Sequence, residues 1–251
     1  MKIFVVGATG LVGGKVAQAL LQNGHAVGAL VRSETSALAL RQGGAELFVG
    51  DLRDAASITR AFTAFGHVDA LITTAYGYGR RKRGDTLQSV DDIGNRHLID
   101  AAAKAGVSRF VFTSVLTADK ARTVPHFYQK HLTEQYLERS GVPWVSLRPG
   151  GFLDTLLGLN LSGIRQGKLM VPTDLDAPAS TILSEDVARY LTLAATTDGV
   201  LGRRIDIGMQ APTNIREIAS ELSAVTGRSI VPSSPPAVVR AIMFGLFQAG
   251  A

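Results

Sequence analysis

Three glycines near the N-terminus have the spacing of a phosphate-binding turn. The segment from residue 7 to residue 13 reads GATGLVG, which is the pattern G-x-x-G-x-x-G. In such a loop the first glycine permits a tight turn, the second lets the backbone approach a pyrophosphate, and the third lets a helix pack closely on a strand. The free N–H groups at the start of that helix donate to the anion. We therefore predict dinucleotide contacts at Gly7, Thr9, Gly10, Leu11, Val12 and Gly13, with a ligand-free glycine turn as the alternative.

Arg32 follows the next apolar run and is a second candidate contact. An acidic residue at this place in a dinucleotide fold binds the ribose 2′-hydroxyl of NAD, whereas an arginine accommodates the 2′-phosphate of NADP. A guanidinium makes bidentate, charge-assisted hydrogen bonds to phosphate. Glu34 stands two residues later, and an ordinary surface arginine is the alternative. The sequence thus favours NADP(H) over NAD(H) as the cofactor.

These residues need a scaffold that brings the ends of several strands together, and the rest of the pattern predicts one. Short apolar runs stand at 2–6, 25–32, 45–51, 68–75, 108–114 and 142–151. Helical stretches separate them, including 33–44, with Ser33 as a possible N-cap, and 86–105. Strands that are apolar on both faces and alternate with helices form a parallel sheet covered on both sides. Right-handed crossovers make that sheet doubly wound, so we predict an α/β fold of the Rossmann type.

The pattern changes after Gly151. Helical stretches at 153–167, 184–196 and 213–227 surround short strand-like runs at 168–174 and 203–208. We expect residues 1–151 to form the nucleotide-binding core and residues 152–251 to form a small α+β region that caps the substrate. This region is expected to be interleaved with the core rather than separate. Ligands bind at the carboxyl ends of the strands in such folds, which is where a cap would lie.

Several segments carry a family resemblance. They are the glycine loop, LVR (30–32), GDLRD (50–54), VDALITTA (68–75), AAAKAGVSRFVFTS (101–114), EQYLERSGVPWVSLRPGGF (134–152), SEDVA (184–188) and GMQAPTNIREIASELSAVTGR (208–228). Together they resemble the atypical short-chain dehydrogenase/reductases of the NmrA-like branch, over nearly the whole chain. The resemblance implies an NAD(P)-binding Rossmann protein, in a branch that includes both reductases and cofactor-sensing regulators.

The resemblance also implies further cofactor contacts where strands end. Two residues after the third strand look like the pair beside the adenine, two at the end of the fourth look like walls around the ribose, and three after the sixth look like the loop that faces the nicotinamide. These residues are, in that order, Asp51 and Leu52, Thr74 and Ala75, and Pro149, Gly150 and Gly151. For Asp51, a turn or helix cap is the alternative.

The chain departs from the family in its catalytic pattern. The oxidoreductases of the family use Tyr-x-x-x-Lys, in which the lysine lowers the pKa of the tyrosine and holds the ribose hydroxyls. The resemblance implies that Lys130 is this lysine, yet His126 and not a tyrosine stands four residues before it. Tyr128 lies two residues away, about 200° round a helix, and cannot simply replace the missing tyrosine. For His126, a surface position in the first turn of a helix is the alternative.

The serine that the family places after the fifth strand is replaced by Val115, with Ser114 and Thr117 nearby. Three interpretations follow. Lys130 and His126 assist proton delivery while the cofactor supplies hydride, or the reduced substrate takes its proton from water, or the protein signals without turnover. The first two describe an NADPH-dependent reductase of a small carbonyl, quinone or similar electron-poor substrate. The third describes a non-catalytic NADP(H)-sensing regulator of the NmrA type.

Composition limits the chemistry further. The 251 residues include no cysteine, which excludes thiolate catalysis and zinc-thiolate or iron–sulfur sites. The five histidines have no metal-ligand spacing, so we expect no metal site. No run reaches the roughly 18 apolar residues that span a bilayer. We therefore expect a cytoplasmic protein without membrane contact, and the family resemblance makes a homodimer possible.

The net charge of +5 comes mainly from one segment. The chain has 26 Lys+Arg and 21 Asp+Glu, and four of the basic residues are Arg80, Arg81, Lys82 and Arg83. This segment follows the run 68–75, so we expect it near the ligand edge of the sheet. It is interpreted as a solvated loop, as a lid over a cofactor or substrate, or, least favoured, as a contact for nucleic acid or protein. The expected partner is a small-molecule substrate.

Overall fold

The computed structural model describes residues 1–77 and 84–242, so the basic residues 80–83 lie outside the described residues. The chain divides into two compact units. The first comprises Met1–Arg148 and Glu185–Ile207, and the second comprises Pro149–Ser184 and the chain from Gly208 onward.

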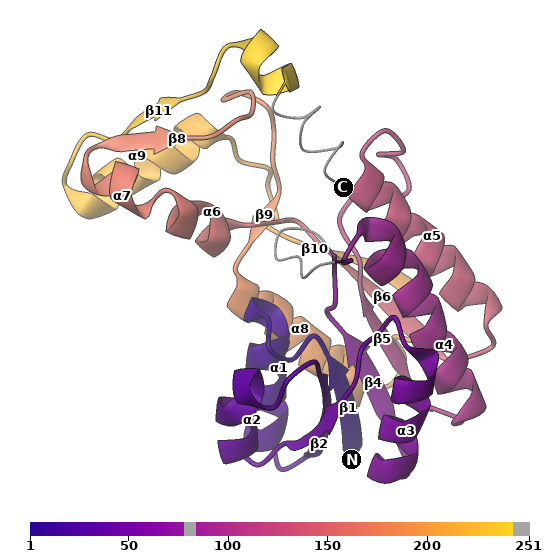
Figure 1. The fold of residues 1–251 in the computed structure, drawn as a ribbon. Coiled ribbons are helices and arrows are strands. Elements are labelled where there is room, and N and C mark those ends of the chain that lie inside the picture. Colours follow the sequence, from indigo (N-terminus) through magenta and orange to yellow (C-terminus); the bar gives the residue numbers. More distant parts are fainter. Residues whose placement is uncertain (78–83, 243–251) are drawn as a thin grey trace. The chain divides into compact units, whose positions relative to one another are not determined.

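The first unit is built on a seven-stranded sheet with the strand order β3-β2-β1-β4-β5-β6-β10 (Figure 1). The strands are β1 (Lys2–Val6), β2 (Ala26–Val31), β3 (Glu46–Val49), β4 (Ala70–Thr73), β5 (Phe110–Thr113), β6 (Trp144–Pro149) and β10 (Arg203–Ile207). Neighbouring strands from β3 to β6 pair in parallel. The order grows outward in opposite directions from β1 and β4, which places the topological switch point between them. The predicted doubly wound sheet of the Rossmann type is confirmed.

Burial on both faces of the sheet explains the continuous apolar runs. Ile3 and Phe4, which are neighbours on β1, are both fully buried. Because successive side chains point to opposite faces of a strand, such a run needs helices on both sides. Figure 1 shows α1 and α8 on one face and α3, α4 and α5 on the other. These helices are α1 (Leu11–Gln22), α3 (Ala55–Phe65), α4 (Asn95–Lys104), α5 (Pro125–Arg139) and α8 (Ser184–Thr196).

The stretch 33–44 differs from its prediction. It forms a 3₁₀ turn, η1 (Thr35–Ala37), followed by the short helix α2 (Leu38–Gln42). Glu34 precedes the turn without a capping hydrogen bond from its side chain, so the prediction of Ser33 as an N-cap is wrong. The Ser33 hydroxyl lies 2.7 Å from Thr35 Oγ1, and its carbonyl accepts from the Ser36 hydroxyl. Hydroxyl side chains that bond locally compete in this way with a regular helix.

The helix predicted over 86–105 is present in two forms. A π-helix, η2 (Leu87–Gly94), comes first, and α4 continues from Asn95. A capping box between Thr86 and Ser89 begins the element. The buried Asn95 amide donates to the Val90 carbonyl at 3.3 Å and to the Asp91 carbonyl at 3.1 Å, which satisfies backbone groups where the wide turn ends. π-Helical segments are rare, and π-bulges within helices are frequent at functional sites.

The second unit includes two small two-stranded sheets and several short helices. In one sheet β7 (Gly151–Phe152) pairs with β9 (Thr181–Ile182), and in the other β8 (Lys168–Met170) pairs with β11 (Val231–Ser233). Its helices include α6 (Leu153–Leu159), α7 (Leu161–Arg165) and α9 (Ile215–Thr226). Leu169, Ile215 and Ile218 belong to its hydrophobic cluster. Within residues 1–77 and 84–242, no helix combines the length and the apolar character needed to cross a membrane.

Candidate functional site

The glycine loop between β1 and α1 passes against the end of β4 with room for backbone only. Gly7 has a φ of +86°, which other residues rarely adopt, and a Cβ there would lie 2.6 Å from Thr74 Oγ1. A Cβ on Gly13 would meet the Gly7 carbonyl and would also lie 2.6 Å from Thr74 Oγ1. The loop is closed by a hydrogen bond from the Gly10 N–H to the Gly7 carbonyl at 2.9 Å. The structure thus brings Gly7, Gly13 and Thr74 together, and the dinucleotide contacts assigned to them stay a prediction.

Helix α1 begins at this loop without a capping side chain. Gly10 occupies the N-cap position and the first turn holds no acidic residue. Thr9, Gly10 and Leu11 are exposed, whereas Val12 is buried. The first N–H groups of the helix and the positive end of its dipole therefore face no carboxylate of the helix itself, which is the arrangement that binds a pyrophosphate.

Lys130 reaches the same edge of the sheet from α5. Its Nζ donates to the Ala75 carbonyl at 3.3 Å, lies 3.3 Å from Asp91 Oδ1, and sits 5.0 Å from the centre of the Phe112 ring. Only 12% of the Lys130 side chain is exposed. The predicted ribose wall at Thr74 and Ala75 and the predicted lysine are therefore neighbours, although they lie on different elements.

Asp91 is a site residue that the sequence reasoning missed. Its side chain is 2% exposed, and besides Lys130 it accepts the Gly77 N–H at 2.6 Å through Oδ2. The Thr133 hydroxyl of α5 donates to its backbone carbonyl at 2.8 Å. The helical spacing of the sequence could have indicated it, because Asp91 falls on the buried face of η2, which is formed by residues 87, 90, 91 and 94. A carboxylate at a buried helical position needs a cation, and Lys130 is that cation.

His126 lies one turn before Lys130 on α5 and is only partly exposed. Burial lowers its pKa below the ordinary value, the Asp91 carboxylate works in the opposite direction, and the Lys130 ammonium lowers it further. The imidazole is therefore neutral at pH 7, where it can still donate one N–H but does not carry a proton to give away as an imidazolium.

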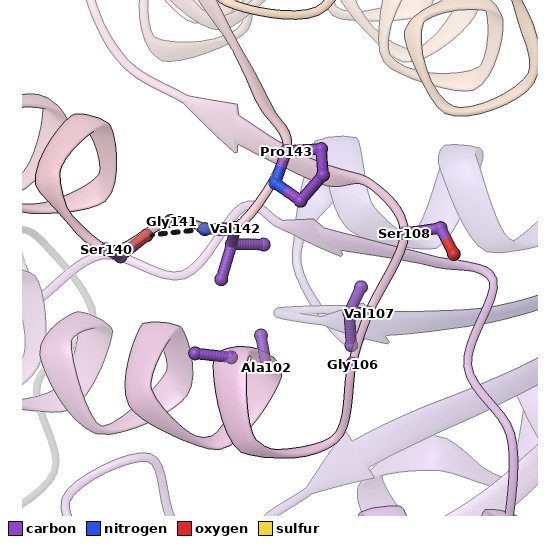
Figure 2. A pocket seen from close by; sticks show the side chains of 9 residues that line it. Ala102, Gly106, Val107, Ser108, Ser140, Gly141, Val142 and Pro143 are labelled. Carbon is purple, nitrogen blue, oxygen red and sulfur yellow. Dashed lines mark hydrogen bonds between the residues drawn. The ribbon is translucent and has the colours of Figure 1, made fainter.

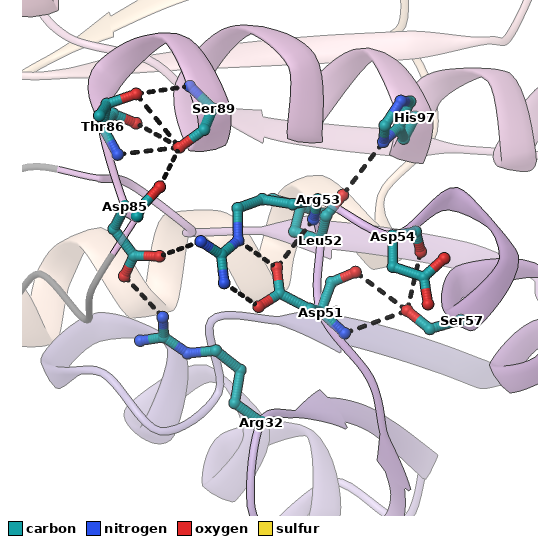
Figure 3. A network of polar contacts seen from close by, with 11 residues as sticks. Arg32, Asp51, Leu52, Arg53, Asp54, Ser57, Asp85, Thr86, Ser89 and His97 are labelled. Carbon is teal, nitrogen blue, oxygen red and sulfur yellow. Dashed lines mark hydrogen bonds and ion pairs between the residues drawn. The ribbon is translucent and has the colours of Figure 1, made fainter.

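Arg32 meets a network of charges at the ends of β2 and β3 (Figure 3). Its Nη1 donates to Asp85 Oδ2 at 2.6 Å, and the other oxygen of Asp85 lies 3.3 Å from Arg53 Nη1. Arg53 holds Asp51 with two parallel bonds, from Nε at 2.9 Å and from Nη2 at 2.7 Å. The predicted contacts Arg32 and Asp51 are thus joined through Arg53 and Asp85, neither of which the sequence reasoning singled out.

The network changes the protonation properties of Asp51. The hydrogen bond from the Arg53 side chain holds the pKa of Asp51 below its usual range, against the opposing effect of burial, and Arg32 adds to the lowering. Asp51 is therefore ionised at neutral pH. Its neighbour Leu52 belongs to the hydrophobic cluster of the first unit, and the adenine contact assigned to this pair stays a prediction.

A second buried charge network holds α5 one turn after Lys130, on the same face of the helix. The Glu134 side chain is fully buried and accepts from Ser146 Oγ at 2.7 Å, from Arg148 Nη2 at 2.6 Å and from Arg204 Nε at 3.3 Å. Burial works to raise the pKa of Glu134, but the hydrogen bonds from Arg148 and Ser146 outweigh it and lower the pKa. The network ties α5 to β6 one turn after Lys130, so it fixes the direction from which Lys130 approaches.

The loop after β5 has one unusual backbone conformation. Ser114 is buried, and Thr117 has a φ of 63°. A β-branched residue in the left-handed region is rare, and its carbonyl accepts from the Lys120 N–H at 2.9 Å in a tight turn. Val115, which we expect at the position of the family's serine, lies in this loop.

Pro149 ends β6, Gly150 follows it, and Gly151 begins β7. The Gly151 N–H donates to the Ser180 carbonyl at 2.9 Å, and a Cβ on Gly150 would lie 2.9 Å from the Ser180 carbonyl carbon. The close approach of this backbone to the segment before β9 explains why position 150 requires glycine. The nicotinamide contact assigned to the three residues stays a prediction.

A pocket of about 450 Å³ lies away from these groups (Figure 2). It is formed where α4 and α5 end and β5 and β6 begin, by residues that include Ala102, Val107, Ser140 and Pro143. No charged side chain lines it, and it lies at the amino ends of the strands, opposite the edge where α/β sheets bind ligands. We do not assign it a function. Among the residues that the structure describes, no cluster of three histidines or carboxylates could hold a metal ion.

Two characterised proteins are similar in sequence over most of the chain. Photosystem II assembly factor Ycf39 of Synechocystis sp. is 29% identical over 243 residues, which cover 96% of this chain and 72% of that protein. The (4-alkanoyl-5-oxo-2,5-dihydrofuran-3-yl)methyl phosphate reductase of Streptomyces griseus is 30% identical over 229 residues, which cover 91% of this chain and 75% of the reductase.

The fold is similar to that of solved NAD(P)-binding proteins. The NADPH-dependent quinone oxidoreductase QOR2 of Escherichia coli, solved in complex with NADPH, superposes with a TM-score of 0.80 at 23% identity, covering 99% of this chain and 86% of QOR2. At this identity the likeness shows the fold alone. The model of the NmrA-like family matches residues 1–245, and the chain therefore belongs to the NmrA-like family.

Proposed function

We propose that this chain is an NADPH-dependent oxidoreductase that reduces a small carbonyl, quinone or similar electron-poor substrate. The observation that carries the proposal is the grouping of the glycine loop, Thr74, Ala75 and Lys130 at one edge of the sheet. Gly7 and Gly13 leave space for backbone only, and α1 presents amides without a capping side chain. Lys130 adds a buried positive charge 3.3 Å from the Ala75 carbonyl. These groups fit the phosphates and ribose of a dinucleotide.

The nicotinamide would supply a hydride when bound. The residues of the chain would bind the cofactor and orient the substrate against it. Lys130 would hold the ribose hydroxyls, and Arg32 would attract the 2′-phosphate, which favours NADP(H). Asp51 and Leu52 would lie by the adenine. Because burial keeps His126 neutral at pH 7, it would orient the substrate by a hydrogen bond. The proton would then come from water, which suits acceptors such as quinones, whose reduced anions need no strong protein acid.

A non-catalytic NADP(H)-binding regulator is the second candidate. The position four residues before Lys130 holds His126 where the oxidoreductases of the family have tyrosine, and its lowered pKa makes it a weak acid catalyst. The names of the relatives support both candidates, because one is a reductase and the other an assembly factor.

The test is the oxidation of NADPH by the purified chain against a panel of quinones, flavins, aldehydes and ketones. Calorimetric titration with NADPH and NADH runs alongside it. Turnover on at least one class of acceptor, with NADPH bound more tightly than NADH, supports the reductase. Nucleotide binding without turnover on any class selects the regulator. A chain that binds neither nucleotide contradicts both.

A further inference from the structure

Asp85 lies between two arginines at the edge where β2 and β3 end. Its Oδ2 accepts from Arg32 Nη1 at 2.6 Å, and its Oδ1 lies 3.3 Å from Arg53 Nη1 (Figure 3). Only 4% of the Asp85 side chain is exposed, whereas 39% of Arg32 is exposed. A buried carboxylate is stable only when cations and hydrogen bonds compensate it, and these guanidinium groups are placed to do so.

Among the residues that the structure describes, this network joins four charged side chains whose charges balance. Arg32 and Arg53 carry two positive charges, and Asp51 and Asp85 carry two negative ones. A phosphate monoester brings about 1.5 to 2 further negative charges at pH 7. If it joined Arg32 while Asp85 stayed in place, two anions would compete for one guanidinium. A ribose 2′-hydroxyl adds no charge and meets no such conflict.

We propose that Asp85 sets the cofactor selectivity of the site, because its carboxylate takes the anion position on Arg32 that a 2′-phosphate requires. NADP(H) then binds only in exchange for the contact between Arg32 and Asp85, whereas NAD(H) binds without that exchange. Arg32 supplies the attraction for the 2′-phosphate, and Asp85 reduces it. This inference rests on the proposed dinucleotide binding and names a residue that tunes it.

The exchange is compatible with the geometry of the two arginines. Arg53 makes its two short bonds to Asp51, so it stays anchored when Asp85 moves. Arg32 has its remaining N–H groups on a side chain that is two-fifths exposed, where a ligand can reach them. A purely structural Asp85, serving only to pin its own segment to β2 and β3, would affect both cofactors equally.

Adenosine 2′,5′-bisphosphate and 5′-AMP differ only in the 2′-phosphate, so their affinities isolate this contact. We expect Asp85→Asn to raise the affinity for the bisphosphate at least about fivefold, measured by calorimetry, while the affinity for 5′-AMP stays within about twofold. Asp85→Ser, with a smaller side chain, serves if the amide variant unfolds. Asp92→Asn removes the same charge from a pair with Arg96 and is the matched control.

A double variant makes the test specific. In the Arg32→Met background, Asp85→Asn should no longer raise the affinity for the bisphosphate, because the shared guanidinium is gone. Equal gains for both nucleotides, no gain for either, or the same gain in Asp92→Asn overturn the role of Asp85. If the unchanged chain binds neither nucleotide nor NADPH, the proposed function itself fails. If every variant binds both nucleotides with an unchanged ratio of affinities, only the proposed role of Asp85 in selectivity is contradicted.

Discussion

Lys130 Nζ and Asp91 Oδ1 lie 3.3 Å apart, and their side chains are 12% and 2% exposed. They come from different elements, α5 and the π-helix η2. An exposed pair of this kind adds little to stability, but a buried pair is costly to break, because the remaining charge has no water around it. Asp91 therefore determines where the Lys130 ammonium stands relative to the end of β4.

Replacing Lys130 tests its role in holding the ribose. We expect Lys130→Met to weaken NADPH binding by roughly 1.5–3 kcal/mol, the value of a hydrogen bond to a charged group. Calorimetric titration measures this loss. Lys104→Met removes a lysine from the exposed end of α4 and should bind NADPH like the unchanged chain. Full affinity in Lys130→Met would remove this lysine from the site.

Replacing Asp91 tests whether its carboxylate positions Lys130 and acts on His126. Asp91→Asn keeps the shape of the side chain, and its carbonyl can still accept the Gly77 N–H. Because the Asp91 carboxylate raises the pKa of His126, we expect the pKa of His126 to fall in the variant, followed by NMR titration of the imidazole. NADPH affinity should fall as well. An unchanged pKa of His126 would show that the Asp91 carboxylate does not act on the imidazole.

The extent of sequence-based prediction differs between the scaffold and the charges. The sheet was predictable because Ile3 and Phe4, like other neighbours in its strands, are buried on opposite faces. The glycine loop was predictable because its three glycines lie within seven consecutive residues. The pair of Arg32 and Asp85 was not, since the two residues are 53 positions apart and belong to different parts of the sheet: Arg32 follows β2, whereas Asp85 lies between β4 and η2. The prediction of Ser33 as an N-cap was wrong because its local hydrogen bonds compete with a regular helix.

The glycine loop provides a test of the close approach between α1 and β4. A methyl group on Gly13 would lie 2.6 Å from Thr74 Oγ1 and against the Gly7 carbonyl, so the loop must shift. We expect Gly13→Ala to lose roughly 1–3 kcal/mol of stability, as overpacking does, and to weaken NADPH binding. Thermal unfolding with and without NADPH measures both effects. Gly43→Ala, whose Cβ would make contacts no closer than 3.4 Å, should change neither.

The lowered pKa of His126 predicts a pH dependence of stability. Because burial lowers the pKa in the folded chain, the unfolded chain binds more protons once the pH drops below about 6.5. The free energy of unfolding should therefore decrease as the pH falls through this range, and His126→Gln should remove that part of the decrease. Urea unfolding between about pH 7.5 and 5.5 measures it. The same slope in both chains would contradict a His126 that is buried in its neutral form.

The network around Glu134 predicts a large loss of stability from a small change. Glu134 is fully buried and holds Arg148 at 2.6 Å and Arg204 at 3.3 Å. Glu134→Gln keeps the size of the side chain but leaves the Arg148 guanidinium, 10% exposed, with the partly exposed Asp119 at 3.0 Å as its remaining ion-pair partner among the described residues, so we expect a loss of roughly 3 kcal/mol, the lower end for a broken buried pair. Glu138 pairs with the same Arg204 at 2.9 Å but is 51% exposed. Glu138→Gln should therefore lose less than about 1 kcal/mol in the same urea unfolding experiment. Equal losses in the two variants would mean that burial does not set the strength of this network.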